Sequence, residues 1–136
     1  MIRHSPRLAA AALACALASA AHSQPPMPPT VTKVVMTHPL VGAPGKEVTL
    51  SEVSRGPGAG SAPHRHDANT FVYVLEGKVE MQVQGGPLLT LGPGEVFYES
   101  PSDIHIVSRN ASATAPATIL VVFVKQAGAP TTVPVH

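Results

Sequence analysis

From Thr30 onward, apolar and polar residues alternate with a period of two, and this alternation most strongly limits what the chain can fold into. Successive side chains of a β-strand point to opposite faces, so a period of two predicts strands that each bury one face. The stretch 78–83 shows the alternation most clearly. No dozen consecutive residues after Thr30 have the 3.6-residue stripe of an amphipathic helix. We therefore predict an all-β fold.

Turn signals separate the predicted strands at short intervals. Eleven glycines and fifteen prolines in 136 residues suit short strands joined by tight turns better than a helical bundle. The predicted strands are 30–36, 47–53, 71–75, 78–83, 88–91, 95–99, 104–108 and 118–124. This density of strands predicts an antiparallel sandwich or barrel. The pattern alone leaves open an immunoglobulin-like sandwich, a lipocalin-like barrel and a jelly roll.

The first two dozen residues have the pattern of an export signal. Arg3 and Arg7 precede an apolar run at 8–17, which has the length of a signal-peptide core and is short for a membrane span. We expect cleavage after Ser23, with cleavage after Ala20 as the alternative. The mature protein is then expected to be periplasmic or secreted and to have no contact with the membrane.

The expected organisation has four parts. Residues 1–23 are the signal peptide, 24–46 a proline-rich arm and the first strand, 47–125 the barrel, and 126–136 a C-terminal tail. The charges are nearly balanced, with nine Lys and Arg against eight Asp and Glu. No basic stripe indicates a nucleic-acid partner. The single cysteine lies in the predicted signal, so no disulfide is expected to stabilise the mature domain.

His64 and His66 form the first candidate site. Residues two apart in a strand share a face, so both imidazoles can reach one point, and imidazole is the commonest neutral metal ligand. An isolated His-x-His is more often a pair of surface histidines, and its surroundings therefore decide between the two interpretations.

These surroundings match a spaced motif. Gly58 is followed after five residues by the His-Arg-His at 64–66, after three more by Thr70 and after six more by Gly77. This order resembles the first motif of the cupin superfamily, which runs glycine, five residues, His-x-His, three or four residues, glutamate, six residues, glycine.

A second stretch resembles the second cupin motif, which runs glycine, five residues, proline, one residue, glycine, two residues, histidine. Gly94 and His105 have this spacing, with Ser100 and Ser102 where proline and glycine are usual. The resemblance covers 47–125 and extends to small exported single-domain cupins. It implies a cupin jelly-roll β-barrel in which His64, His66 and His105 hold one divalent transition metal: iron, zinc, manganese or nickel.

The main departure from the resemblance is Thr70, which stands where metal-binding cupins have a carboxylate ligand. Three interpretations remain open. The three histidines form the site by themselves, as in histidine-only zinc sites. Alternatively, Glu99 or Asp67 supplies a substitute carboxylate, although Asp67 starts on the opposite strand face from its neighbour His66. In the third interpretation the cavity binds a ligand without metal.

Arg109 is the candidate substrate-binding residue, with Thr70 beside it. Arg109 shares strand parity with His105, so it is expected to point into the barrel and pair with a substrate carboxylate. The alternative is an arginine at a strand end that faces solvent.

The resemblance supports more than one function. An open metal site in a small barrel suits dioxygenase-like or other small-molecule chemistry, since cupin thiol dioxygenases use a three-histidine iron centre. A non-catalytic module that binds a small molecule or a metal, and a structural module with relic histidines, are the alternatives. A small-molecule ligand is the expected partner. A homodimer is also expected, paired through the apolar edge 31–36.

Overall fold

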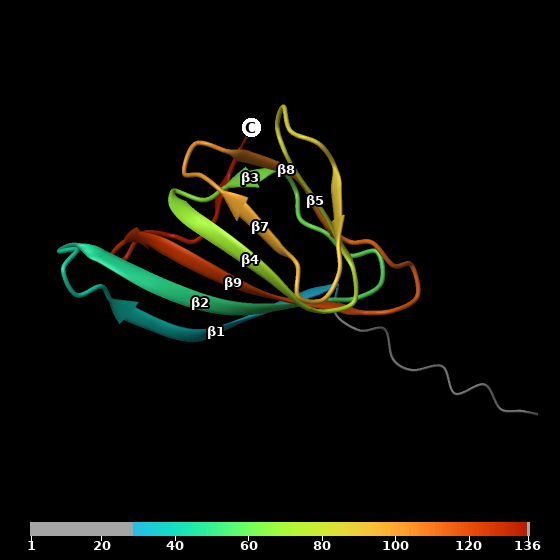
Figure 1. Cartoon of the computed structure of the whole chain (residues 1–136), viewed down its shortest axis with the longest axis horizontal. Helices are drawn as coiled ribbons and strands as arrows, with labels where there is room; N and C mark the ends of the chain where they lie inside the picture. Colours follow the sequence, from blue (N-terminus) through green and yellow to red (C-terminus); the bar gives the residue numbers. More distant parts are fainter. Residues whose placement is uncertain (1–28, 136) are drawn as a thin grey trace, which may run out of the picture.

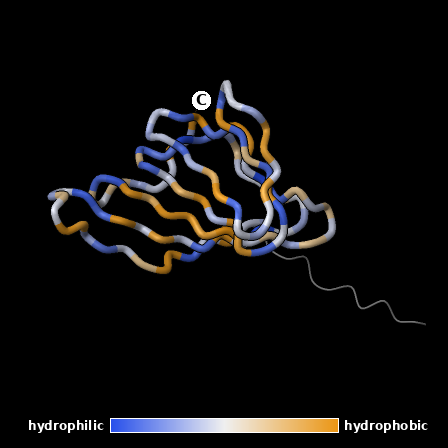
Figure 2. Tube along the Cα trace, in the orientation of Figure 1, coloured by the Kyte–Doolittle hydropathy of each residue, from blue (hydrophilic) through white to orange (hydrophobic). Residues whose placement is uncertain are grey.

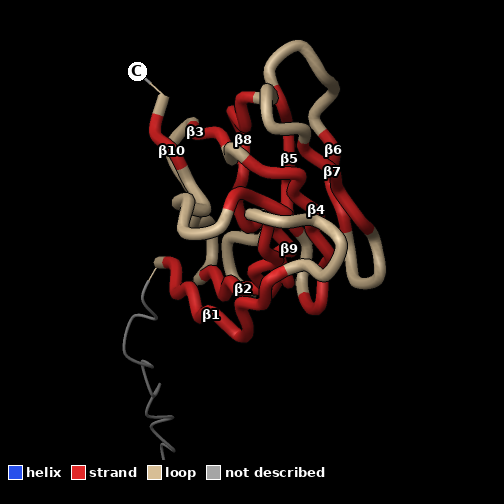
Figure 3. The backbone as a smooth tube through the Cα atoms, turned by 90° about the vertical axis from the view of Figure 1, so that its left-hand side faces the viewer, coloured by secondary structure: helices blue, strands red, loops and turns tan. Residues whose placement is uncertain are grey.

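The computed structural model describes residues 29–135, and every regular element in this range is a β-strand (Figure 3). The strands are β1 (Thr30–Pro39), β2 (Lys46–Arg55), β3 (His64–Arg65), β4 (Ala68–Glu76), β5 (Val79–Val83), β6 (Leu89–Leu91), β7 (Val96–Glu99), β8 (Ile104–Asn110), β9 (Ala117–Gln126) and β10 (Val133–Pro134). All eight predicted strands are present, which confirms the all-β prediction. Within this range no helix is long and apolar enough to cross a membrane. The predicted signal peptide lies outside the described residues.

The strands form two five-stranded antiparallel sheets that face each other (Figure 1). One sheet has the order β1-β2-β9-β4-β7 and the other the order β10-β3-β8-β5-β6. Several neighbouring strands are far apart in sequence, as in the pairings of β2 with β9 and of β3 with β8, and this is the connectivity of a jelly roll.

The C-terminal segment takes part in the second sheet. Val133 pairs with Arg65 and Pro134 with His64, so β10 forms one edge of that sheet. The two sheets therefore include strands outside the expected 47–125, because β1 and β10 each add one strand.

The apolar core lies between the sheets and follows the predicted alternation. Alternate residues of β4, β5 and β9 are buried, while their neighbours are more exposed. Figure 2 shows the apolar residues concentrated along the strands. The buried apolar residues are Ala68, Val72, Val74, Val79, Met81, Leu91, Ala117, Ile119, Val121 and Phe123. This core fills one part of the interior, and polar side chains fill the rest.

Two motif positions require glycine for physical reasons. Gly77 has a φ of 75°, and a Cβ atom there would lie 2.5 Å from the carbonyl oxygen of Pro116. Gly94 has a φ of 86° in the turn before β7. Residues with a side chain rarely adopt this backbone region, so glycine allows the tight β4–β5 and β6–β7 connections.

Candidate metal centre

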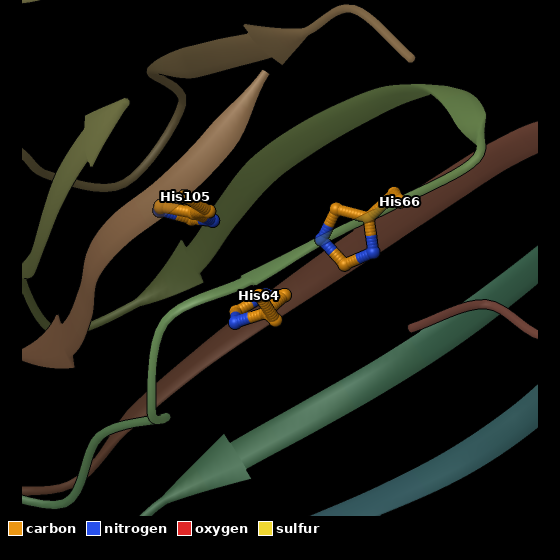
Figure 4. A group of neighbouring side chains, drawn as sticks. All are labelled: His64, His66 and His105. Atoms are coloured by element: carbon orange, nitrogen blue, oxygen red, sulfur yellow. The ribbon is translucent and has the colours of Figure 1, made fainter. Parts of the chain in front are cut away.

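The structure brings His64, His66 and His105 together, as the sequence predicts. His64 on β3 and His105 on β8 are directly opposite each other in the second sheet. His66 follows β3, where the chain crosses to β4 in the first sheet. Figure 4 shows the three imidazoles grouped around one space. The ring centroid of His64 lies 4.8 Å from that of His66 and 5.2 Å from that of His105, and all three residues are buried.

Backbone carbonyls orient two of the three rings. His64 Nδ1 lies 2.7 Å from the carbonyl oxygen of Ala62, and His66 Nδ1 lies 2.5 Å from that of Thr131. A carbonyl only accepts, so each Nδ1 carries the proton and each Nε2 keeps its lone pair. This arrangement is the usual outer-shell support of a metal-binding histidine. Burial also lowers the pKa of His64, which favours the neutral form that binds metal.

Glu99 supplies a carboxylate at the histidine cluster. It is the last residue of β7, it is 1% exposed, and one of its oxygens lies 3.0 Å from His105 Nδ1 and 3.7 Å from His66 Nε2. Thr70 and Glu99 are directly opposite each other on β4 and β7. The carboxylate missing at Thr70 is therefore present one strand away, on the same inward face.

Several buried polar atoms at this point have no hydrogen-bond partner within residues 29–135. They are Thr70 Oγ1, both carboxylate oxygens of Glu99 and both ring nitrogens of His105. The close contact between Glu99 and His105 lacks the angles of a hydrogen bond. Buried polar groups are nearly always satisfied, so a cluster of unsatisfied donors and acceptors indicates an additional group between them.

The arrangement of these ligand atoms fits a metal ion. The three histidines each offer a nitrogen, and these atoms all lie within 4.8 Å of one another. Two nitrogens bound at about 2.1 Å to the same tetrahedral ion are about 3.4 Å apart, so the rings must approach one another by up to about 1.4 Å to hold one ion. Three imidazoles with one carboxylate suit iron, zinc, manganese or nickel.

A cavity adjoins the cluster and gives it room for a ligand. Its volume is about 110 Å³. All three histidines and Glu99 line it, together with apolar residues that include Val53, Val72 and Ile119. Drug-sized pockets measure roughly 300–1,000 Å³, so this cavity suits a much smaller molecule.

Arg55 is a site residue that the sequence analysis missed. It ends β2, is 4% exposed and lines the same cavity. Its Nη2 donates to Ser108 Oγ at 2.7 Å and lies 3.4 Å from Ser61 Oγ. Burial lowers the pKa of Arg55 to about 10, partly offset by the charge of Glu99. The side chain therefore remains a cation at neutral pH.

The expected inward orientation of Arg109 is wrong. Gln82 on β5 pairs with Val107, but Val83 pairs with His105, so β8 has one extra residue at position 106. Such a bulge reverses the parity of everything beyond it. Ser108 therefore points inward, and Arg109 points outward to Glu80, with Nε 2.5 Å from its carboxylate. Thr70 is fully buried opposite Glu99 and is not among the residues that line the cavity.

Asp67 faces outward, as its neighbour relationship to His66 predicts. Its carboxylate lies 3.1 Å from Arg65 Nε, and both side chains are about half exposed. In the second motif, where serines stand in place of the usual proline and glycine, Asp103 stabilises the turn. Its carboxylate accepts from the backbone N–H of Ser100 at 2.7 Å, and its own N–H donates to the Ser100 carbonyl.

Comparisons with known proteins agree with this fold. The family model described as a cupin domain matches residues 51–123. None of the curated protein sequences compared with the chain matches it significantly.

Three solved structures illustrate the likeness. A DMSP lyase from Ruegeria pomeroyi has 20% identity and a TM-score of 0.61, over 76% of this chain but only 50% of its own length. A cupin-2 domain protein from Rhodospirillum rubrum has 20% identity and a TM-score of 0.59, over 82% of this chain and 69% of its own. KdgF from a Halomonas species has 21% identity and a TM-score of 0.57, over 76% and 86%. At these identities the likeness shows the shared fold.

Proposed function

We propose a function from the premise that the chain belongs to the cupin superfamily and contains a type-2 cupin domain. In this proposal the barrel binds one divalent transition metal through His64, His66, His105 and Glu99. When loaded, the site would support the conversion of a small molecule held in the adjoining cavity. The observation that supports it is the group of buried, unsatisfied side-chain atoms at one point between the sheets.

The residues around the site have separable roles. The carbonyls of Ala62 and Thr131 hold the rings of His64 and His66 with Nε2 toward the cluster. Glu99 lowers the net charge of the loaded site, and the apolar wall limits the access of water. When bound, the metal would act as a Lewis acid or activate dioxygen or water. Four protein ligands leave positions open on an ion that takes six.

Metal analysis tests this proposal most directly. Protein purified from the compartment where it is native should contain close to one equivalent of a transition metal by elemental mass spectrometry. The purified protein is then screened with small organic acids and thiols for oxygen consumption and for product formation. Activity should disappear with a chelator and return with the metal. Protein that contains metal but converts no substrate would favour the non-catalytic binding alternative, and protein without metal that cannot be loaded would contradict the proposal.

We also propose that the protein is exported, on the basis of the predicted signal at 1–23. The mature chain should then start at Gln24 or, if cleavage follows Ala20, at Ala21. Intact-mass measurement of the protein from the periplasm or medium checks this. A mature protein that still contains Met1 would contradict it.

Finally, we propose a homodimer with β1 at the interface. Within residues 29–135, β1 pairs only with β2, and Val31, Val34 and Met36 are 49%, 59% and 44% exposed on it. Exposed apolar edges of this kind favour pairing with a second copy. Sedimentation at high micromolar concentration should show a dimer, and Val34→Lys should shift it to the monomer. A monomeric wild-type protein would contradict the proposal.

A further inference from the structure

Arg55 differs from the other two arginines of the described range. Arg65 and Arg109 are about half exposed, and each lies against a carboxylate. Arg55 is 4% exposed, and within residues 29–135 no carboxylate lies within ion-pair distance of it. The residue opposite it on β9 is Ala117. The most buried arginine is therefore the one without an anionic partner.

The hydrogen bonds of Arg55 are also incomplete. A guanidinium has five N–H donors, and here Nη2 contacts two serine hydroxyls while Nε and Nη1 have no partner within the described residues. Leaving a buried donor unpaired costs free energy, and a buried charge without a partner costs more. The fold nevertheless keeps this side chain in place. Asn110, itself buried, donates from Nδ2 to the backbone carbonyls of Gly56 and Ala115 and contacts that of Arg55.

The charges around the cavity point to the missing partner. The ionisable side chains that line it are Arg55, Glu99 and the three histidines. Arg55 and Glu99 offset each other, and the histidines are neutral when they bind metal. A divalent ion would therefore leave the cavity with a net positive charge. An anion would offset this charge and accept hydrogen bonds from the unpaired donors of Arg55.

We propose that this cavity binds a small carboxylate anion, with its charged end against Arg55 and Ser108 and its other end at the histidine cluster. The inference rests on the proposed function for the role of the metal, but the Arg55 contact stands on its own geometry. The cavity volume of about 110 Å³ limits the ligand to an acid of a few carbon atoms, and Val53 and Ile119 line the space beside its chain.

The test uses acetate, propionate and butyrate as probes, with propionamide as an uncharged probe of nearly equal shape. Binding is measured by calorimetry and by ligand-observed NMR on the metal-loaded and the chelated protein. At least one acid should bind to both forms, and propionamide should bind at least tenfold more weakly than propionate. Arg55→Met should weaken the binding of the acid about 10- to 100-fold, as expected for a charge-assisted hydrogen bond. Arg55→Lys keeps the charge without the planar fork and should give an intermediate loss.

Arg109→Met is the matched control, because this arginine lies on the outer face and pairs with Glu80. It should bind the acids as the wild type does. The wild-type comparison of propionate with propionamide needs no variant, so the test holds even if Arg55→Met fails to fold. Equal binding of the acid and the amide, no binding of any acid, or tighter binding of inorganic phosphate than of the acids would each overturn the inference. If the chelated protein binds the acid through Arg55 but no metal can be loaded, the inference stands and the proposed function fails.

Discussion

Each end of strand β2 carries a charged residue on its inward face, and only one of these two residues has an ion-pair partner within the described residues. At one end Glu47 lies directly opposite Lys125 of β9, and the two form an ion pair. The N–H of Gly128 also donates to Glu47, at 3.2 Å. At the other end Arg55 lies opposite Ala117, and the carboxylate that raises its pKa, Glu99, is at the histidine cluster.

This difference separates a structural ion pair from a binding site. The Lys125 side chain is 4% exposed, but Glu47 neutralises its charge, so no further group is needed there. Arg55, Glu99 and His105 are equally buried but keep unsatisfied atoms. Desolvation without compensation costs several kcal/mol for an ion, and a fold retains such a cost only where another group compensates it. The contrast predicts that a ligand binds at the Arg55 end of β2 and that the ion pair at the Glu47 end does not affect this binding.

The largest expected effect is on metal binding at the histidine cluster. His66→Ala removes a ligand and should weaken metal binding by more than about 100-fold, since the loss of an outer-shell partner alone costs about 10- to 100-fold. Glu99→Gln keeps the shape but removes the charge, and it should have a smaller effect in the same direction. Calorimetric titration with iron(II), zinc and manganese measures both.

Asp67→Asn is the control for these variants, because Asp67 is the exposed carboxylate next to His66 in sequence. Its metal affinity should equal that of the wild type. If wild type and His66→Ala bind every metal equally, the histidines are not a metal site, and the metal-free interpretation of the cavity takes its place.

A smaller effect is expected when the carboxylate is moved to the neighbouring strand. Glu99→Thr should weaken metal binding about 10-fold or more, whereas Thr70→Glu combined with Glu99→Thr should recover most of the loss. The reason is that positions 70 and 99 are directly opposite each other and both face inward. Titration of the three proteins under one set of conditions decides the question. If the double variant binds metal as weakly as Glu99→Thr does, a carboxylate at position 70 cannot replace the one at position 99.

The histidine cluster could be predicted from the sequence because it depends on regular geometry. His64 and His66 share a face in a strand, and the motif spacing that resembles cupins brings His105 beside them. The sequence leaves open whether Glu99, Asp67 or no carboxylate completes this cluster. Only the pairing of β4 with β7 shows that it is beside Thr70, since strand pairing is a long-range property that local alternation does not contain.

Arg109 and Arg55 show why the arginine that lines the cavity could not be predicted. Because of the bulge at residue 106, His105 and Arg109 face opposite sides of β8, and no local sequence signal predicts this bulge. On β2 the inward face holds Thr49, Ser51 and Arg55, while apolar Leu50 faces the other way. The hydrophobic pattern therefore predicts that the face with Leu50 is the buried one, whereas the structure buries the face with Thr49, Ser51 and Arg55. The signal available in the sequence was the shared parity of polar residues at 49, 51 and 55.

The structural end of β2 should respond in the opposite way to the site. Lys125→Met leaves Glu47 without its partner, and it should lower the midpoint of thermal unfolding by a few degrees. Metal affinity should remain at the wild-type value, because neither residue lines the cavity. Differential scanning fluorimetry, with and without metal, measures the first effect and calorimetry the second. A loss of metal affinity in Lys125→Met would show that the two ends of β2 are coupled.

The smallest expected effect is a pH dependence of stability that belongs to the Glu47 end alone. The hydrogen bond from Lys125 and that from the Gly128 N–H hold the pKa of Glu47 below its usual value of 4.5. As the pH falls below 4.5, the unfolded chain takes up this proton before the folded protein does, so the free energy of unfolding decreases. The decrease ends once the pH is below the pKa of Glu47 in the folded protein. Urea unfolding of the chelated protein between pH 5 and pH 3 should show this loss in the wild type and in His66→Ala, and a reduced loss in Lys125→Met. Equal slopes in all three proteins would mean that the acid-sensitive carboxylates lie elsewhere, and the ion pair at this end of β2 would then contribute little to stability.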